Sequence, residues 1–194
     1  MPSPARIDLT NQFLIAMPGM VDETFSRSVV YLCEHNEKGA LGLVINKPID
    51  IKLKNLFEKV DLPLDRPDLA EAPVFFGGPV QTERGFVLHD RIEGDESPYS
   101  STLAIPGGEL EMTTSKDVLE AISVGAGPRR VLVTLGYAGW GAGQLEDEIA
   151  RNGWLTVDAE PSVIFDTPAE SRYGRALSLL GIDVGMLMQD AGHA

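Results

Sequence analysis

A buried strand followed by a glycine-rich segment and a helix constrains the fold of this chain more than any other stretch. Residues 131–135 are continuously apolar, which is typical of a strand that is covered on both faces. Residues 144–152 have apolar side chains four apart, which predicts a helix. The glycines between them, predicted to form a loop, are Gly136, Gly139, Gly141 and Gly143. Such a loop either presents backbone N–H groups to a ligand or simply turns the chain tightly.

The remaining strand-like segments mostly come in pairs that are joined by short polar turns. Such pairs predict antiparallel hairpins. The expected hairpins join 28–35 to 40–46, 73–80 to 85–89, and 102–105 to 109–113. Single helices are expected over 51–60, 116–124 and 169–180, and two further strands over 154–157 and 163–165. Strands that pair locally, with helices inserted singly, favour an α+β fold with one continuous core over a doubly wound sheet.

The charge balance argues against direct binding to nucleic acid. The chain has 194 residues with 16 Lys and Arg against 29 Asp and Glu, which gives a net charge of −13. Nucleic-acid affinity depends largely on clustered Lys and Arg, and no long basic run occurs here. We expect a single domain over residues 1–190, followed by a disordered tail over 191–194.

Cysteine usage and hydropathy favour the cytoplasm. Cys33 is the one cysteine of the chain, so no disulfide can form within it. The first residues have one arginine and no apolar core, unlike a signal peptide. No apolar run approaches the roughly 20 residues that a membrane crossing requires. We therefore expect a cytoplasmic protein with no membrane partner.

Cys33 and His35 form the first candidate site. They lie two residues apart in a predicted strand, so their side chains should share a face. A cysteine beside a histidine could supply a thiolate with its base, or two zinc ligands. The structural alternative is a small buried thiol and a histidine at a strand end. Because the chain has no CxxC or HExxH spacing, we expect neither a metal nor another cofactor.

The glycine-rich segment is the second candidate site, and it contains two aromatic side chains. Its spacing matches neither a phosphate-binding loop nor a dinucleotide fingerprint. Tyr137 and Trp140 could line a pocket for a planar or apolar group, or Trp140 could fill the core of a tight turn. The ligand-pocket candidates are Gly77, Gly78, Gly136, Tyr137, Gly139 and Trp140. A third, weaker candidate is His89, a histidine at a predicted strand end that could act as a general base.

The order of several motifs resembles the YqgE/AlgH family of bacterial proteins. These motifs are NQFLIAMP (11–18), FSRSVVYLCEH (25–35), GALGLVINKP (39–48), FGGPV (76–80), GFVLH (85–89), LGYAGWGAGQLEDEI (135–149), NGWL (152–155) and FDTP (165–168). The resemblance covers almost the whole chain. It departs from the family pattern at Arg172-Tyr173, where the family usually has Arg-Trp.

The resemblance implies a single α+β domain whose complex, bifurcated, mostly antiparallel sheet forms a partial barrel flanked by a few helices. It also implies a link to transcriptional regulation, through a role of AlgH in alginate production, and it identifies no catalytic residues. Together with the charge of −13, it favours regulation through a small ligand or a protein partner and not by direct DNA binding.

Two other functions remain open from the residues alone. One is a hydrolase or thiol-dependent enzyme that uses Cys33 and His35, with His89 and Asp22 as possible helpers. The other is a protein-interaction module that is recognised through the acidic segment 61–71.

Overall fold

The computed structural model describes residues 8–19, 22–91 and 98–182, and their strands form one ten-stranded sheet. The strands are β1 Gln12–Ala16, β2 Val29–Asn36, β3 Gly39–Val44, β4 Pro48–Lys52, β5 Pro73–Phe76, β6 Val80–Asp90, β7 Thr102–Ala104, β8 Leu110–Thr113, β9 Val131–Gly141 and β10 Trp154–Asp158. The helices are α1 Leu53–Lys59, α2 Pro67–Ala70, α3 Asp117–Ser123, α4 Gln144–Ala150, α5 Pro161–Phe165, the 3-10 turn η1 Ala169–Ser171 and α6 Arg172–Leu179. The α+β prediction is confirmed, whereas the predicted tail at 191–194 lies outside the described residues.

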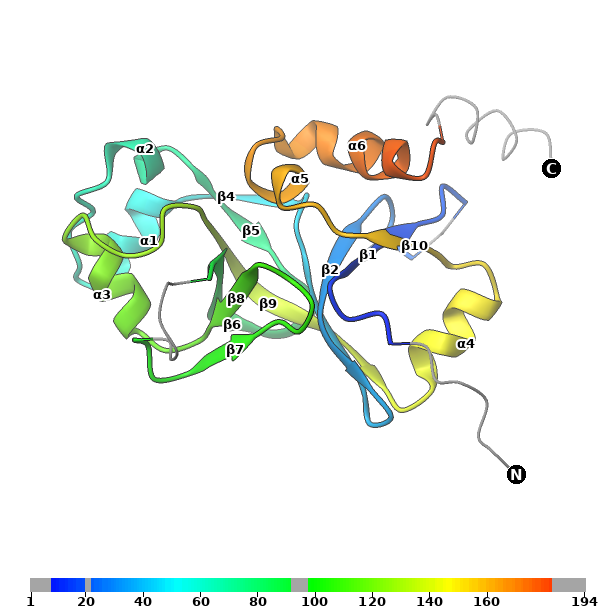
Figure 1. Ribbon diagram of the computed structural model, residues 1–194. Coiled ribbons are helices and arrows are strands. Elements are labelled where there is room, and N and C mark those ends of the chain that lie inside the picture. Colours follow the sequence, from blue (N-terminus) through cyan, green and yellow to red (C-terminus); the bar gives the residue numbers. More distant parts are fainter. Residues whose placement is uncertain (1–7, 20–21, 92–97, 183–194) are drawn as a thin grey trace.

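The sheet divides at β9, which runs through the middle of the molecule (Figure 1). The first half of one β9 edge pairs in parallel with β5, where Phe75 lies opposite Thr134. The second half of that edge pairs antiparallel with β3, where Leu41 lies opposite Gly139. The other edge pairs antiparallel with β6. The path β10-β1-β2-β3-β9-β6-β8-β7, with β4 and β5 as a branch, is the bifurcated, curled sheet that the resemblance implied.

Side chains alternate between the two faces of the sheet and so enter different hydrophobic clusters. On β1, Phe13 and Ile15 enter a central cluster with Tyr31 of β2, while Leu14 enters a second cluster with Trp140. Helices α5 and α6 cover the central cluster, α4 covers the second, and α1 and α3 cover a third (Figure 1). The buried residues of the third cluster are Leu53, Phe57, Val74, Val87, Tyr99, Val118, Ile122 and Val133.

The predicted glycine-rich loop was wrong, because β9 continues through it as far as Gly141. Gly136 has φ +82° and kinks the strand between its two halves. Beyond the kink, glycines permit close approach of backbones: a Cβ on Gly39 would lie 2.1 Å from the carbonyl oxygen of Trp140. The helix that was predicted after the glycines does form, as α4.

Three other local predictions were also wrong. Segments 73–80 and 85–89 do not form a hairpin, because β5 pairs with β4 and β9 instead of β6. Residues 163–165 belong to α5, which begins at Pro161. The last helix, predicted to extend to residue 180, ends at Leu179, and Leu180 is 37% exposed. The hairpins β2–β3 and β7–β8 are as predicted.

Within the described ranges, none of the helices combines the length and the apolar content that a bilayer crossing demands.

Candidate functional site

Gly77, Gly78 and Gly136 form a seam at which backbones touch. A Cβ on Gly77 would lie 2.3 Å from the carbonyl oxygen of Gly136, and a Cβ on Gly78 would lie 2.1 Å from the carbonyl carbon of Tyr137. The Gly77 N–H donates to Leu135, and the Gly77 carbonyl accepts from Val44. Because these glycines have no side chains, the backbones of β3, β9 and the segment after β5 can approach closely where the sheet divides. This seam includes the backbone of Tyr137.

A hollow of about 410 Å³ borders Tyr137 and the hairpin β2–β3. Its walls are Glu34, Asn36, Lys38, Gly39, Ala40, Leu41, Val80, Tyr137, Gly139 and Trp140. The volume is within the range of small-ligand sites. Of the predicted pocket residues, Tyr137, Gly139 and Trp140 border this hollow, whereas Gly77, Gly78 and Gly136 do not.

Two neighbours fix the Tyr137 ring in place. Phe86 packs edge-on against it, with ring centroids 5.5 Å apart. On the strand side the ring lies over Gly139, where a Cβ would be 3.3 Å from a ring carbon. The Tyr137 hydroxyl makes no hydrogen bond to any described residue, so it is available to a molecule in the hollow.

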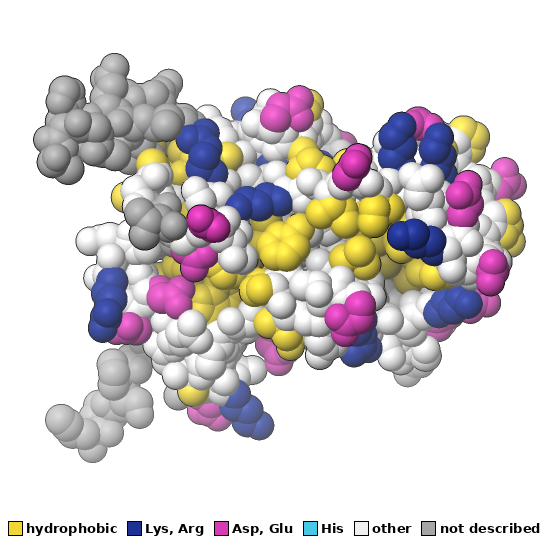
Figure 2. Space-filling view, turned by 180° about the vertical axis from the view of Figure 1, so that it is seen from behind, with side chains coloured by type: hydrophobic (Ala, Val, Ile, Leu, Met, Phe, Trp, Pro, Cys, Tyr) yellow, Lys and Arg dark blue, Asp and Glu magenta, His cyan; other side chains and the backbone are white. Residues whose placement is uncertain are grey.

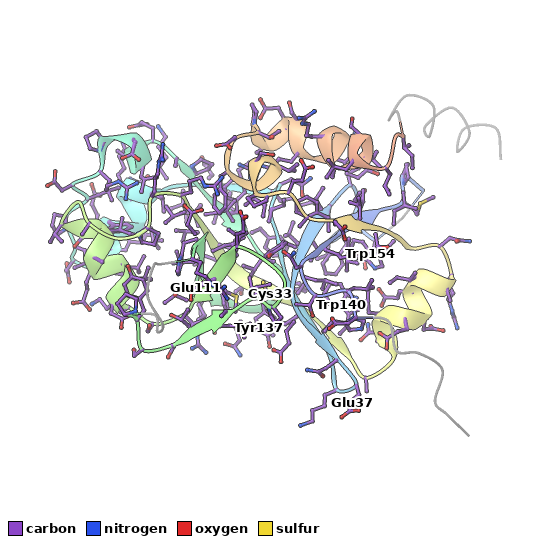
Figure 3. The ribbon with its side chains drawn as sticks, in the orientation of Figure 1. Cys33, Glu37, Glu111, Tyr137, Trp140 and Trp154 are labelled. Atoms are coloured by element: carbon purple, nitrogen blue, oxygen red, sulfur yellow. The ribbon has the colours of Figure 1, made fainter. Side chains whose placement is uncertain are left out.

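Trp140 is mainly a core residue. Its side chain is 6% exposed, and its ring packs against Phe25 and Trp154. The indole Nε1–H donates to Glu148 Oε1 at 3.1 Å, and the Trp154 Nε1–H donates to the same oxygen at 2.9 Å. Figure 3 shows Trp140 and Trp154 on the α4 side of the hairpin and Tyr137 on the other. Both residues border the hollow, but the Trp140 indole lies mainly in the core, whereas the Tyr137 ring is only partly buried.

Cys33 and His35 do not share a face, contrary to the expectation from strand alternation. A bulge between Leu32 and Glu34 of β2 interrupts the alternation. Cys33 packs in the central cluster with 0% exposure, and its burial raises the pKa of the thiol. His35 lies on the α4 side, where its Nδ1 accepts the Leu9 N–H and its Nε2–H donates to Glu146. A thiol-dependent reaction needs an exposed thiolate beside its base, and this arrangement offers neither.

His89 is held in a buried chain of hydrogen bonds. Its side chain has 0% exposure; Nδ1–H donates to the carbonyl of Asp90 at 2.8 Å, and Nε2 accepts from the Thr113 hydroxyl at 2.7 Å. Tyr99 packs edge-on against the imidazole, with centroids 5.8 Å apart. Burial lowers the pKa of His89, so the ring is neutral at pH 7. Both ring nitrogens have protein partners, as expected for a structural histidine.

The lowered pKa of His89 predicts that the fold loses stability in mild acid. The unfolded chain takes up a proton on this ring near pH 6.5, which the folded protein resists, so stability is fully present above that pH and declines below it. We expect the free energy of unfolding to fall by at most about 1.4 kcal/mol per pH unit from this group. Urea unfolding between pH 7 and pH 5 should show a smaller decline in His89→Gln than in the wild type. Equal slopes would contradict the assignment.

The acidic segment 61–71 is partly neutralised within the chain. Glu71 pairs with Lys52 and Lys54, and Asp68 pairs with Arg66. Hydrogen bonds from the two lysines lower the pKa of Glu71 to about 2. Figure 2 shows acidic side chains scattered over the visible face, with hydrophobic side chains in a band across its middle. This face therefore presents no continuous acidic surface.

Arg172 is a functional candidate that the sequence analysis did not identify. It begins α6 and is 7% exposed. Its Nε–H donates to the Thr167 carbonyl at 2.9 Å and its Nη1–H to the Ile45 carbonyl, while its guanidinium lies 4.8 Å from the centroid of Phe75. The available signal was spacing: Arg172 precedes the inward-facing Ala176 by four residues, which places both on one helix face.

Comparison with known proteins supports the resemblance found in the motifs. The family model for AlgH-like proteins matches residues 13–185. The chain belongs to the AlgH-like family. It is 68% identical over 192 residues to a UPF0301 protein of Cupriavidus metallidurans, covering 99% of this chain and 98% of that protein. A UPF0301 protein of Polaromonas is 69% identical over 191 residues, covering 98% and 97% respectively.

Solved structures show the same AlgH-like fold. The solution structure of the AlgH protein from Pseudomonas aeruginosa matches with a TM-score of 0.77 and 47% identity, and covers 100% of both chains. A crystal structure of a Corynebacterium diphtheriae protein matches with a TM-score of 0.67 over 90% of this chain and 88% of that one. At 22% identity, this second likeness shows the fold alone. These comparisons establish the family and the fold, and they assign no function to the sites described above.

Proposed function

We propose that this AlgH-like chain is a ligand-responsive regulatory protein, and that its ligand binds in the hollow beside Tyr137. The observation that carries the proposal is a half-buried phenol with a free hydroxyl, fixed by Phe86 and Gly139, on the wall of a 410 Å³ hollow. Aromatic walls with a few polar groups are typical of sites for small planar or apolar ligands. The lining charges, Glu34 and Lys38, have opposite signs and leave the hollow without a strong preference for ionic ligands.

The location of the hollow gives a ligand contact with three strands. Leu41 belongs to β3, Val80 begins β6, and Tyr137 lies on β9 directly after the kink at Gly136. A molecule that touches all three would bias how β3 and β6 pair with β9. Regulation would then act through a protein partner, because a net charge of −13 opposes direct contact with DNA.

Binding of planar metabolites should depend on Tyr137. A panel of small aromatic and apolar compounds would be tested by thermal shift, and compounds that raise Tm would be titrated by calorimetry. We expect Tyr137→Ala to weaken binding by about tenfold or more, because it removes the aromatic wall. Tyr137 is the appropriate position because Trp140→Ala would also remove a core residue.

Tyr137→Phe is the matched control, since it keeps the ring and removes only the hydroxyl. It should retain binding of apolar compounds and weaken only those that use the phenol. A panel in which no compound stabilises the wild type, or in which Tyr137→Ala binds as tightly as the wild type, would refute the proposal.

A further inference from the structure

We propose a second binding site, for a small organic acid whose carboxylate pairs with Arg172 and whose apolar body fills the cavity beside it. This cavity, called here the Arg172 cavity, has a volume of about 410 Å³. It lies between α1–α2 and α5–η1, with β5 and the first half of β9 along its base. Figure 1 shows α2 and α5 on either side of β5. The site is separate from the hollow beside Tyr137, with which it shares no lining residue.

Arg172 carries a buried positive charge that no described carboxylate contacts directly. Glu170 favours the charged form electrostatically but forms no ion pair with it. The contacts of Arg172 are two backbone carbonyls and the face of Phe75, and no acidic side chain among the described residues forms an ion pair with it. Burying a charge without a counter-charge is costly. Burial lowers the pKa of Arg172 to about 10, so the guanidinium remains charged at neutral pH.

The guanidinium has N–H groups that no described residue accepts. Nε and Nη1 are used by Thr167 and Ile45, whereas Nη2 donates to no described residue. Arg172 itself lines the cavity. A ligand carboxylate there would accept hydrogen bonds from the remaining N–H groups of the guanidinium and place a negative charge in direct contact with it.

Apolar side chains form most of the remaining wall. They include Leu53, Leu69, Phe75, Val133, Ile164 and Phe165. An apolar body of a ligand would be removed from water against these groups, at about 25 cal/mol for each Å² buried. A cavity with one fixed charge and apolar walls therefore selects an acid with a hydrocarbon or aromatic body.

The charged residues at the mouth of the Arg172 cavity favour a ligand with one negative charge over a ligand with two. Asp68 and Asp166 line the cavity and are exposed, and Asp68 is paired with Arg66. Asp166 lies 3.8 Å from Arg130, whose guanidinium is also bonded to Asp90. An adjoining polar hollow carries Arg66, Arg129 and Arg130 against Asp68, Asp90 and Asp166, so it is balanced. Arg172 adds one positive charge, which suits a monocarboxylate better than a phosphate dianion.

Octanoate, 1-octanol and inorganic phosphate are suitable probes for the full-length wild-type chain. Octanoate has both proposed features, 1-octanol has only the apolar body, and phosphate has only the charge. At a concentration about a hundredfold above its Kd, and below micelle formation, octanoate should raise Tm by about 5 °C or more. We expect 1-octanol and phosphate to raise it by less than a third as much. Equal shifts with octanoate and 1-octanol, or no shift with octanoate, would overturn the proposal without any variant.

Two substitutions then locate the site. Arg172→Lys keeps the charge but loses the planar fork, and Ala72→Phe fills the cavity while leaving Arg172 in place. Each should weaken octanoate binding by at least tenfold in calorimetry. Ala150→Phe, the same change at an exposed position of α4 outside the cavity, is the matched control and should bind as the wild type does.

Tyr137→Ala should also bind octanoate normally, which separates this site from the hollow beside Tyr137. Wild-type affinity in Ala72→Phe would show that octanoate binds elsewhere and would refute the assignment. Loss of octanoate binding in Tyr137→Ala would assign the acid to the other hollow and would refute it equally.

Discussion

Replacing Gly78 with alanine should lower the free energy of unfolding by about 4 kcal/mol or more, the largest effect that we expect from a single substitution. An added Cβ would lie 2.1 Å from the Tyr137 carbonyl carbon and 2.2 Å from its oxygen. Both are backbone atoms of the central strand and cannot rotate away. The clash could be relieved only if the segment that follows β5 moved away from β9 at the point where the sheet divides. Urea unfolding followed by the fluorescence of Trp140 and Trp154 would measure the loss.

Gly85→Ala is the matched control for this experiment. Gly85 is a glycine of β6 that also pairs with β9, opposite Leu135. A Cβ at this position would meet no atom within 4 Å. We expect its free energy of unfolding to stay within about 0.5 kcal/mol of the wild type. Similar losses of unfolding free energy in Gly78→Ala and Gly85→Ala would show that the clash with the Tyr137 backbone is not the cause of the destabilisation.

Glu148→Ala should cost about 2–4 kcal/mol, the second largest effect. The carboxylate of Glu148 accepts the indole N–H groups of Trp140 and Trp154, which are 6% and 3% exposed. Removing it leaves two nearly buried donors without their acceptor. The same substitution removes the hydrogen bonds that join α4 to β9 and β10. Circular dichroism in urea would give the loss, and tryptophan emission would report the changed surroundings of both rings.

Asp147→Ala, at the adjacent position of α4, separates this role from a general effect of removing an acid. Asp147 is exposed, and among the described residues its carboxylate pairs only with Arg151, one helical turn away. We expect a change below about 1 kcal/mol. Equal losses at positions 147 and 148 would contradict the assignment of the two indoles to Glu148.

Local structure was predictable where neighbouring residues determine it. The hairpin β2–β3 follows from a short polar turn, and α4 follows from apolar spacing after Gly143. The pairing of β5 was not predictable in the same way. On one side β5 pairs with β9, which follows more than fifty residues later in the sequence. The residues between β5 and β6 have the composition of an ordinary hairpin turn, which predicts the wrong partner. The parallel arrangement depends on long-range packing that no local pattern records.

The candidate sites were also predictable only where local sequence patterns determine them. Strand alternation placed Cys33 beside His35, but one bulged residue sends the two side chains into different clusters. Tyr137 was identified because an aromatic residue among glycines is locally unusual. Arg172 was not identified, because its burial depends on Thr167, Ile45 and Phe75, and the last two are distant in sequence.

The late position of β9 in the chain has a consequence for synthesis on the ribosome. Strands β3, β5 and β6 all pair with it, and β1 pairs with the still later β10. A nascent chain of 130 residues therefore has hairpins whose edges remain open until the shared strand leaves the exit tunnel. Closure of the sheet is delayed until β9 and β10 have emerged, and before then a chaperone would protect the open strand edges from aggregation.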